Sequence, residues 1–251
     1  MELSVRLSAV ADLILPTETF ADVGCDHGYL SVYLIEKNIC RKVIAMDVRK
    51  GPLERAGQTI ERFGCRNLIE TRLSDGIRKL APQEADGFVC AGMGGRLALQ
   101  ILHQDKEKVA CMKQVILQPQ SELWLVRRML ARWGMQIETE QMVCEEGKFY
   151  PMMRICPNPE FASAQPVCEE KFLAGFSEHD WKHYAQELYG KMLLESGHPV
   201  LKEFLEKEIT RLGQIRNGLM QSKQCDSGKE RLEELDAELL IARNARSFYF
   251  G

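Results

Sequence analysis

The sequence predicts an α/β fold, in which a twisted and mainly parallel sheet carries helices on both faces and a smaller helical region follows. Three observations predict it. Short apolar runs alternate with amphipathic stretches over residues 20–132, two strand-like runs in succession follow over residues 135–156, and leucines then recur at helical spacing over residues 199–243. Alternation of this kind is typical of parallel sheets. The 251 residues are enough for one large domain and an appendage.

The first elements follow from the spacing of apolar residues. Residues 3–15 place Leu3, Leu7, Val10 and Ile14 on one helical face, and Pro16 ends that helix. Helices are predicted next at residues 29–36, 52–62, 96–103 and 122–132, with a proline in the first turn of the second, where a missing N–H is harmless. Between them, strands are predicted at residues 20–23, 42–47, 67–72, 87–91 and 114–118.

The pattern changes after residue 134. Residues 135–144 and 149–156 are strand-like and are joined by Glu145-Glu-Gly-Lys148, which suits a hairpin turn. A Rossmann-like parallel sheet that ends in a β-hairpin is the arrangement of class I methyltransferases, whereas a dinucleotide-binding domain more often continues with another strand and helix. Pro157-Asn-Pro159 marks a boundary, so we expect one domain over residues 1–158 and a second over residues 159–251.

The second domain is predicted to be helical. Apolar residues recur at alternating three- and four-residue steps over residues 199–223 and again over residues 229–243, with a turn at Asp226-Ser-Gly228 between them. Two such seams joined by a short turn predict an antiparallel coiled-coil hairpin. The simplest interpretation is that these residues pack together, and the pattern does not say what the hairpin binds.

Composition excludes several classes of protein. The net charge is −3, and residues 161–251 carry 12 Lys and Arg against 15 Asp and Glu, so a nucleic acid would have to meet a local patch rather than a basic domain. The nine cysteines are scattered without a Cys-x-x-Cys pair, which favours reduced thiols, a cytoplasmic location and no metal site. No apolar run reaches the ~18 residues of a membrane span, so we expect no membrane partner.

The predicted site is centred on the turn after the first buried strand, Asp22-Val-Gly24-Cys-Asp26-His27-Gly28-Tyr29. Glycines in a strand-to-helix turn let backbone N–H groups approach a ligand closely. Two carboxylates in the same turn would repel a pyrophosphate, so this turn disfavours a dinucleotide and favours a ligand with positive charge and hydroxyls. S-adenosylmethionine (SAM) has both, in its sulfonium, its ammonium and its ribose.

Other candidate residues follow the next strands, at the edge where open α/β sheets bind ligands. Asp47 ends the second strand and can accept hydrogen bonds from both hydroxyls of a ribose, unless it is simply an exposed strand end. Asp75 and Gly76 follow the third strand and can accept from an adenine amine or form an ordinary turn. Ala91-Gly-Met-Gly-Gly95 follows the fourth, and so many glycines imply that a ligand lies against the backbone.

Four side chains complete the candidate set. Gln118 and Gln120 flank a proline at the end of the fifth strand and can hydrogen-bond a base edge, although a proline turn before a helix explains them equally well. Tyr29 can stack on a base or pack in the core, and His27 beside it is a candidate general base.

The sequence contains seven motifs that are informative as a set: Leu3-Ser-x-x-Arg6-Leu7, Asp22-x-Gly24-Cys-Asp26-His27-x-Tyr29-Leu30, Gly51-Pro52-Leu53, Asp75-Gly76, Ala91-Gly-Met-Gly-Gly95, Leu117-Gln-Pro119 and Glu146-x-Lys148-x-Tyr150. In this combination the chain resembles the bacterial tRNA (adenine-22)-N1-methyltransferases. The resemblance runs from Leu3 to about Arg154 and continues more loosely through residues 188–194. Gln120 departs from it, because an Asn is expected after the proline.

The resemblance implies a two-domain, SAM-dependent enzyme that methylates N1 of adenine 22 in the D-arm of tRNA. We also expect a monomer whose helical arm contacts tRNA. By position, the residues expected to bind SAM are Asp22, Gly24, Asp26, Gly28, Asp47, Asp75, Gly76 and Gly92. Those expected to bind the target base are Arg6, His27, Tyr29, Met93, Gly94 and Gln120, with Asp26 and Gln118 nearest the chemistry.

Methylation at N1 of adenine does not require a strong catalytic base. This nitrogen lies on the Watson–Crick edge, so a paired adenine must be flipped out before it can react. Its lone pair is free at neutral pH, and the enzyme would chiefly hold it in line with the methyl group. Asp26 is the candidate to stabilise the positive charge that the purine gains.

Two other classes of function stay open from the residues alone. A SAM-dependent enzyme that acts on a protein or a small molecule would explain why no basic domain is present. A non-catalytic nucleotide-binding module with a partner-binding coiled coil is the other, although a scaffold does not require glycines and carboxylates at successive strand ends. Methyl transfer to tRNA separates both from the main hypothesis.

Overall fold

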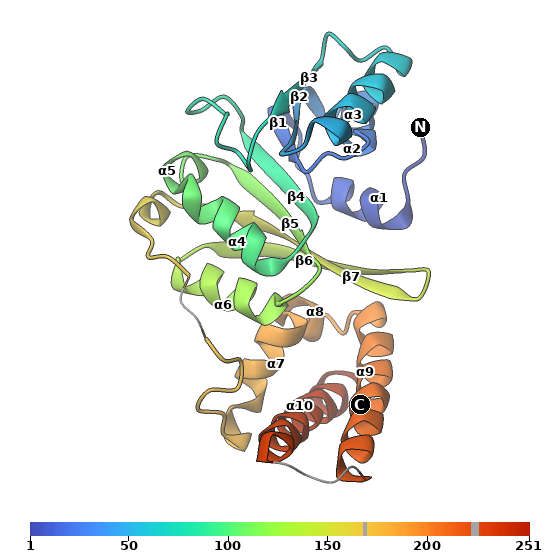
Figure 1. The fold of residues 1–251 in the computed structure, drawn as a ribbon, viewed down its shortest axis with the longest axis vertical. Coiled ribbons are helices and arrows are strands. Elements are labelled where there is room, and N and C mark those ends of the chain that lie inside the picture. The colour runs from blue at the N-terminus through green and yellow to red at the C-terminus, as the bar shows by residue number, and fades with distance from the viewer. Residues whose placement is uncertain (168–169, 222–225) are drawn as a thin grey trace. The chain divides into compact units, whose positions relative to one another are not determined.

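The computed structural model describes residues 1–167, 170–221 and 226–251 (Figure 1). The chain forms two compact units. The first contains residues 1–122 and 128–167, and the second contains residues 123–127 and 168–251. The domain boundary that the sequence places between residues 158 and 159 stays a prediction.

The first unit is built on a sheet whose strands, within the described residues, follow the order β3-β2-β1-β4-β5-β7-β6. Strands β1 to β5 pair in parallel, whereas β7 pairs antiparallel with both β5 and β6. The predicted α/β fold with a sheet ending in a β-hairpin is therefore confirmed. The strands are β1 (Thr17–Val23), β2 (Cys40–Asp47), β3 (Ile69–Leu73), β4 (Gly87–Met93), β5 (Gln114–Pro119), β6 (Gln136–Glu145) and β7 (Lys148–Cys156).

The central strands form where apolar residues run without interruption. In β5, Val115, Ile116 and Leu117 are fully buried, as expected for a strand covered on both faces. The hairpin turn between β6 and β7 lies at Glu146 and Gly147, whose φ angles of +50° and +77° suit the tight two-residue turns of hairpins. The predicted turn at residues 145–148 is thus confirmed.

Helices cover both faces of this sheet (Figure 1). Buried residues of α1, α2 and α3, among them Val10, Val32 and Ile60, pack with Val43 and Val89 of the sheet. The first helix is shorter than predicted because Ser4 caps it, its hydroxyl accepting from the Leu7 N–H at 3.3 Å. The helices are α1 (Val5–Asp12), α2 (Tyr29–Glu36), α3 (Lys50–Arg62), α4 (Gly95–Gln104), α5 (Lys106–Val109) and α6 (Leu123–Arg132), followed by the 3₁₀ turn η1 (Pro159–Ser163).

The second unit is helical, as predicted. Its two long helices lie side by side (Figure 1), and Leu212, Leu235 and Leu239 form the buried contact between them. Ile215, which the sequence places on the same seam, is 38% exposed. The coiled-coil geometry itself stays a prediction. The elements are η2 (Glu178–Asp180), α7 (Trp181–Tyr189), α8 (Lys191–Glu195), α9 (Pro199–Gln221) and α10 (Asp226–Phe250).

The turn predicted between these helices is wrong. Asp226, Ser227 and Gly228 are the first residues of α10, because a single glycine is tolerated in a helix whose apolar face is buried. Residues 222–225, where the chain passes from α9 to α10, lie outside the described residues, as does the predicted end of the first helix at residue 223. Among the helices of the described ranges, none is long and apolar enough to cross a membrane.

Candidate active site

A cavity of about 540 Å³ opens in the first unit at the carboxyl ends of the parallel strands. It lies where β1 meets β4, the point from which the sheet grows toward β3 on one side and toward β6 on the other. Ligands of open α/β sheets bind at such a point. The volume falls within the roughly 300–1,000 Å³ of small-molecule sites.

Most of the residues predicted from the sequence line this cavity. They are Arg6, Asp22, Gly24, Asp26, His27, Tyr29, Asp47, Asp75, Gly76, Gly92, Met93 and Gln120. Gly28, Gly94 and Gln118 are not part of its lining. The structure therefore brings the carboxyl ends of β1 to β5 together with Arg6 of α1, and the binding role of each residue stays a prediction.

The turn after β1 is shaped by its backbone. The N–H groups of Gly24 and Cys25 donate to the Met46 carbonyl at 2.8 and 3.0 Å, which ties the turn to β2. Gly24 has a φ of +76°, and a Cβ there would collide with the Met93 methyl group. Gly28 has a φ of +71° and begins α2, but its Cβ position faces Ala56 at 3.1 Å. Gly28 thus lets α2 approach α3 and supports the turn from behind.

Asp22 is a buried carboxylate in the wall of the cavity. One of its oxygens accepts a hydrogen bond from the Ser31 hydroxyl at 2.6 Å. Burial raises the pKa of Asp22 to about 6, and the neighbouring charge of Asp47 adds to the increase. A positively charged ligand would relieve this unfavourable ionisation, so the cavity favours cations.

Asp47 ends β2 and is 7% exposed. Its Oδ1 accepts from the Arg49 N–H at 2.9 Å. Within the part of the chain that the structure describes, its Oδ2 has no hydrogen-bond donor, so this oxygen can accept from a ligand hydroxyl. The Asp47 carbonyl also accepts from the Ser74 N–H at 2.9 Å, which joins the second turn of the site to the third.

Asp26 lies on the rim rather than deep in the cavity. Its side chain is 60% exposed and pairs with Arg55 at 2.9 Å, with His27 at 3.6 Å on the other oxygen. The rings of His27 and Tyr29 stack with their centroids 5.8 Å apart. Water and Arg55 screen the Asp26 charge, which weakens the case for it as the group that stabilises a cationic base.

Gln118 is fully buried and lies outside the lining of the cavity, and its predicted place beside the reacting atoms stays a prediction. Its Oε1 accepts from an Arg6 Nη1–H at 2.9 Å, so it acts on the cavity only through that arginine. The Arg6 guanidinium also lies 5.6 Å from the centre of the Tyr150 ring. Gln118 and Tyr150 together fix the direction of Arg6.

The glycine run at the end of β4 forms the floor of the cavity. The Gln120 N–H donates to the Met93 carbonyl at 2.8 Å, and the Gln120 amide nitrogen lies 3.6 Å from where a Cβ on Gly92 would be. Gly94 begins α4 and lies against Ser121, with its Cβ position 3.3 Å from the serine hydroxyl, which explains why it is not in the lining. Gly92 and Met93 therefore line the cavity directly, and the contact of Gly94 with a substrate stays a prediction.

Two thiols near the cavity are poor nucleophiles. Burial raises the pKa of Cys90 to about 12, and the charge of Asp22 adds to that effect. Burial raises the pKa of Cys25 well above its usual range as well. Thiolates, not thiols, react, so covalent chemistry at these residues is disfavoured at neutral pH.

Sequence reasoning missed several lining residues, including Val48, Leu97 and Ile101. Val48 is 62% exposed and follows Asp47, but a single valine after a strand forms no pattern. Leu97 and Ile101 are four residues apart on α4, so helical spacing could have placed both on the face toward the site. These apolar side chains offer a surface on which a purine ring can lie.

A hairpin-closed parallel sheet with a cavity of buried carboxylates and open glycine turns at its carboxyl edge defines the class: a class I methyltransferase. Comparison with known proteins leads to the same class. Residues 3–153 match the model of the methyltransferase domain family, and the chain belongs to that family.

The chain is also similar to individual proteins within this family. The tRNA (adenine(22)-N(1))-methyltransferase of Bacillus subtilis is 28% identical over 94% of this chain and 93% of its own. The crystal structure of the B. subtilis M1A22 tRNA methyltransferase TrmK matches with a TM-score of 0.79 at 26% identity, covering 98% of this chain and 99% of that one. The crystal structure of Streptococcus pneumoniae Sp1610 in complex with S-adenosyl-L-methionine matches with a TM-score of 0.79 at 25% identity, covering 98% and 100%. The resemblance stated from the sequence motifs is confirmed.

Proposed function

We propose that the protein transfers the methyl group of SAM to N1 of adenine 22 in tRNA. The observation that carries the proposal is the cavity at the carboxyl edge of the sheet, where Asp22 and Asp47 meet the glycine turns. The similarity to the B. subtilis enzyme over 94% of the chain supports the choice of substrate.

The residues of the cavity fit SAM. Asp47 has a free carboxylate oxygen for the ribose hydroxyls, and the buried charge of Asp22 suits a ligand with an ammonium and a sulfonium. Asp75 and Gly76 form the part of the wall assigned to the adenine of SAM. When bound, SAM supplies a methyl group on a positively charged sulfur.

The chain's own residues then have to hold the target base. N1 of adenine attacks with its lone pair, the carbon–sulfur bond breaks with its electrons left on sulfur, and the positive charge passes to the purine. No proton has to leave in this step, so His27 is not required as a base. We assign Arg6, Tyr29, Met93 and Gln120, which surround the floor of the cavity, to the task of orienting a flipped adenine.

We further propose that the protein acts as a monomer in the cytoplasm, where its substrate is found, and that the second unit contacts tRNA. Seven cysteines in the described residues are free thiols, which suits a reducing compartment. Residues 161–251 carry 12 basic against 15 acidic side chains, so contact with tRNA through this unit has to be local.

Mass mapping of tRNA tests the proposal. A tRNA that carries adenine 22 is incubated with the protein and SAM bearing a deuterated methyl group, then digested and mapped by position. We expect one labelled 1-methyladenosine, at position 22, and no label in a tRNA with guanine 22. Label in a protein or a small molecule would make it a methyltransferase of another substrate, and SAM binding without transfer would make it a binding module.

A further inference from the structure

The wall of the cavity that carries Asp75 and Gly76 belongs to a long irregular segment. After β3 ends at Leu73, residues 74–86 contain no regular helix or strand before β4 begins. Loops of this kind are the mobile parts of most proteins. A binding wall on such a segment has to be held by groups outside it.

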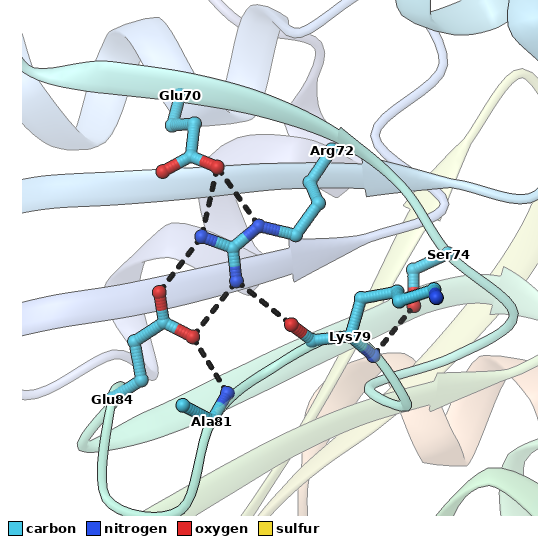
Figure 2. Close-up of polar contacts among 6 residues, drawn as sticks. All are labelled: Glu70, Arg72, Ser74, Lys79, Ala81 and Glu84. Atoms are coloured by element: carbon cyan, nitrogen blue, oxygen red, sulfur yellow. Dashed lines mark hydrogen bonds and ion pairs between the residues drawn. The ribbon is translucent and has the colours of Figure 1, made fainter.

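One guanidinium holds most of this segment. Arg72 of β3 donates from Nη1 to Glu84 Oε2 at 2.8 Å and from Nη2 to Glu84 Oε1 at 2.7 Å, a bidentate pair. The same Nη1 donates to the Lys79 carbonyl at 3.0 Å, and Nε donates to Glu70 at 2.8 Å. Figure 2 shows the guanidinium enclosed by Glu70, Glu84 and that carbonyl. The hydrogen bond from Arg72 lowers the pKa of Glu84, so the pair stays ionised at neutral pH.

A second cation holds the residues directly after Gly76. Lys108 of α5 donates through Nζ to the carbonyls of Ile77 and Arg78, at 3.3 and 2.9 Å. Its ammonium is oriented by Asp105 at 2.7 Å. Arg72 and Lys108 therefore engage three consecutive carbonyls of one turn, those of residues 77, 78 and 79.

The first residue of the segment links this turn to the site. The Ser74 N–H donates to the Asp47 carbonyl at 2.9 Å, and the Ser74 hydroxyl accepts from the Lys79 N–H at 3.2 Å (Figure 2). The far end is fixed separately, because Asp86 accepts from the Thr19 N–H and pairs with Lys113. Loss of either cation would thus free the turn at residues 74–79 and leave the strands anchored.

We propose that Arg72 and Lys108 are positioning residues for the adenosine part of SAM, which act by holding Asp75 and Gly76 in the wall of the cavity. Neither cation lines the cavity itself. The inference rests on the proposed function, since it takes SAM as the ligand, but it concerns residues that no motif of the sequence singled out.

Substitutions of Arg72 and Lys108 in the full-length protein test this inference. In Arg72→Met we expect the Kd for SAM, measured by calorimetry, and the KM for SAM to rise about 10-fold, while kcat at saturating SAM stays within twofold. Arg72→Lys keeps the charge without the bidentate geometry and should recover part of the affinity. Lys108→Met should raise the Kd about threefold. Arg66→Met is the matched control, because within the described residues the Arg66 side chain forms only an exposed pair, with Glu61 at 3.0 Å.

A double-mutant cycle shows whether the effect passes through the wall. If Arg72 acts by holding Asp75, Arg72→Met should weaken SAM binding much less in an Asp75→Ala background than in the wild type. An unchanged Kd in Arg72→Met, or a fall in kcat without a change in KM, overturns the inference. Should Arg72→Met fail to fold, Lys108→Met and Glu84→Gln give the same readout. A wild-type protein that does not bind SAM refutes the proposed function instead, so the two failures are distinguishable.

Discussion

The carboxylates at the two ends of the parallel strands differ in how far the protein itself satisfies their charge. At the amino ends, Asp86 accepts from the Thr17 hydroxyl at 2.7 Å and from the Thr19 N–H at 3.1 Å, and it pairs with Lys113 at 2.7 Å. At the carboxyl ends, Asp22 accepts from the Ser31 hydroxyl, and no donor among the described residues reaches Asp47 Oδ2. One edge satisfies its charge within the chain, whereas the other leaves charge for a ligand.

The pKa values follow this contrast. Burial alone would raise the pKa of Asp86, but the hydrogen bonds from Lys113, Thr17 and the Thr19 N–H outweigh it and lower the pKa to about 2. For Asp22, burial outweighs the hydrogen bond from Ser31, and the pKa rises to about 6. Unfavourable ionisation is concentrated where a cation is expected to bind, which is typical of functional sites. The amino edge of the sheet therefore stabilises the fold, whereas the carboxyl edge gives up stability for binding.

The largest effect is expected at the amino edge. Asp86→Ala leaves the Thr19 N–H and the Thr17 hydroxyl without their acceptor, so the free energy of unfolding should fall by about 3 kcal/mol. Urea denaturation measures it, and the affinity for SAM should not change in the folded protein. Lys113→Met removes only an exposed partner and should lower the free energy of unfolding far less than Asp86→Ala. If Asp86→Ala weakened SAM binding without lowering the free energy of unfolding, the proposed difference between the two edges would be wrong.

The matching change at the carboxyl edge is Asp47→Ala. It removes the acceptor assigned to the ribose hydroxyls, so SAM binding should weaken by roughly 1.5–3 kcal/mol, the scale of charge-assisted hydrogen bonds. The free energy of unfolding should change far less than in Asp86→Ala. Calorimetry decides the matter, and an unchanged affinity would remove Asp47 from the site.

Asp22→Asn tests the pH dependence. The folded pKa of about 6 lies above the unfolded value, so the stability tied to the protonated form is present below pH 3.8 and is lost as the pH rises through 6. The asparagine variant avoids that loss and should be about 2 kcal/mol more stable than the wild type at pH 7. Urea denaturation at several pH values should show the gain vanish near pH 4. For Asp86 the sign is reversed, and its contribution is lost as the pH falls toward 2.

The smallest effect is expected on the rim. Arg55 and Asp26 form an ion pair whose side chains are 45% and 60% exposed, so Arg55→Met should change the free energy of unfolding by less than about 1 kcal/mol. Steady-state methylation should keep kcat within about twofold, because positioning rather than the Asp26 charge is expected to govern the rate. A several-fold rise in kcat would show that Arg55 had been masking a carboxylate that stabilises the methylated base.

How much of this could be predicted from the sequence depended on distance along the chain. Asp22 and Asp47 end apolar strands, and the carboxyl ends of parallel strands share one edge, so local pattern alone brings them together. That Gln118 is buried outside the cavity lining could not be predicted, because the pattern does not say which way a strand-end side chain faces. The role of Arg72 was missed because Lys79 and Glu84 reach it only through the path of an irregular loop, although Glu70 is its neighbour on the same strand.

In the second unit, too, local sequence patterns predicted some elements and missed others. Its two long helices, α9 and α10, followed from leucine spacing, but the predicted turn at Asp226 was wrong because tertiary packing overrides the turn preference of Asp and Gly. Spacing also placed Ile215 on the seam, whereas packing leaves it partly exposed.

A structure of the protein with S-adenosylhomocysteine, the demethylated product, tests the central claim most directly. The account predicts the product in the cavity, with a ribose hydroxyl about 3 Å from Asp47 Oδ2 and the adenine beside Asp75 and Gly76. Product bound at another place, or a ribose beyond hydrogen-bond reach of Asp47, would contradict it.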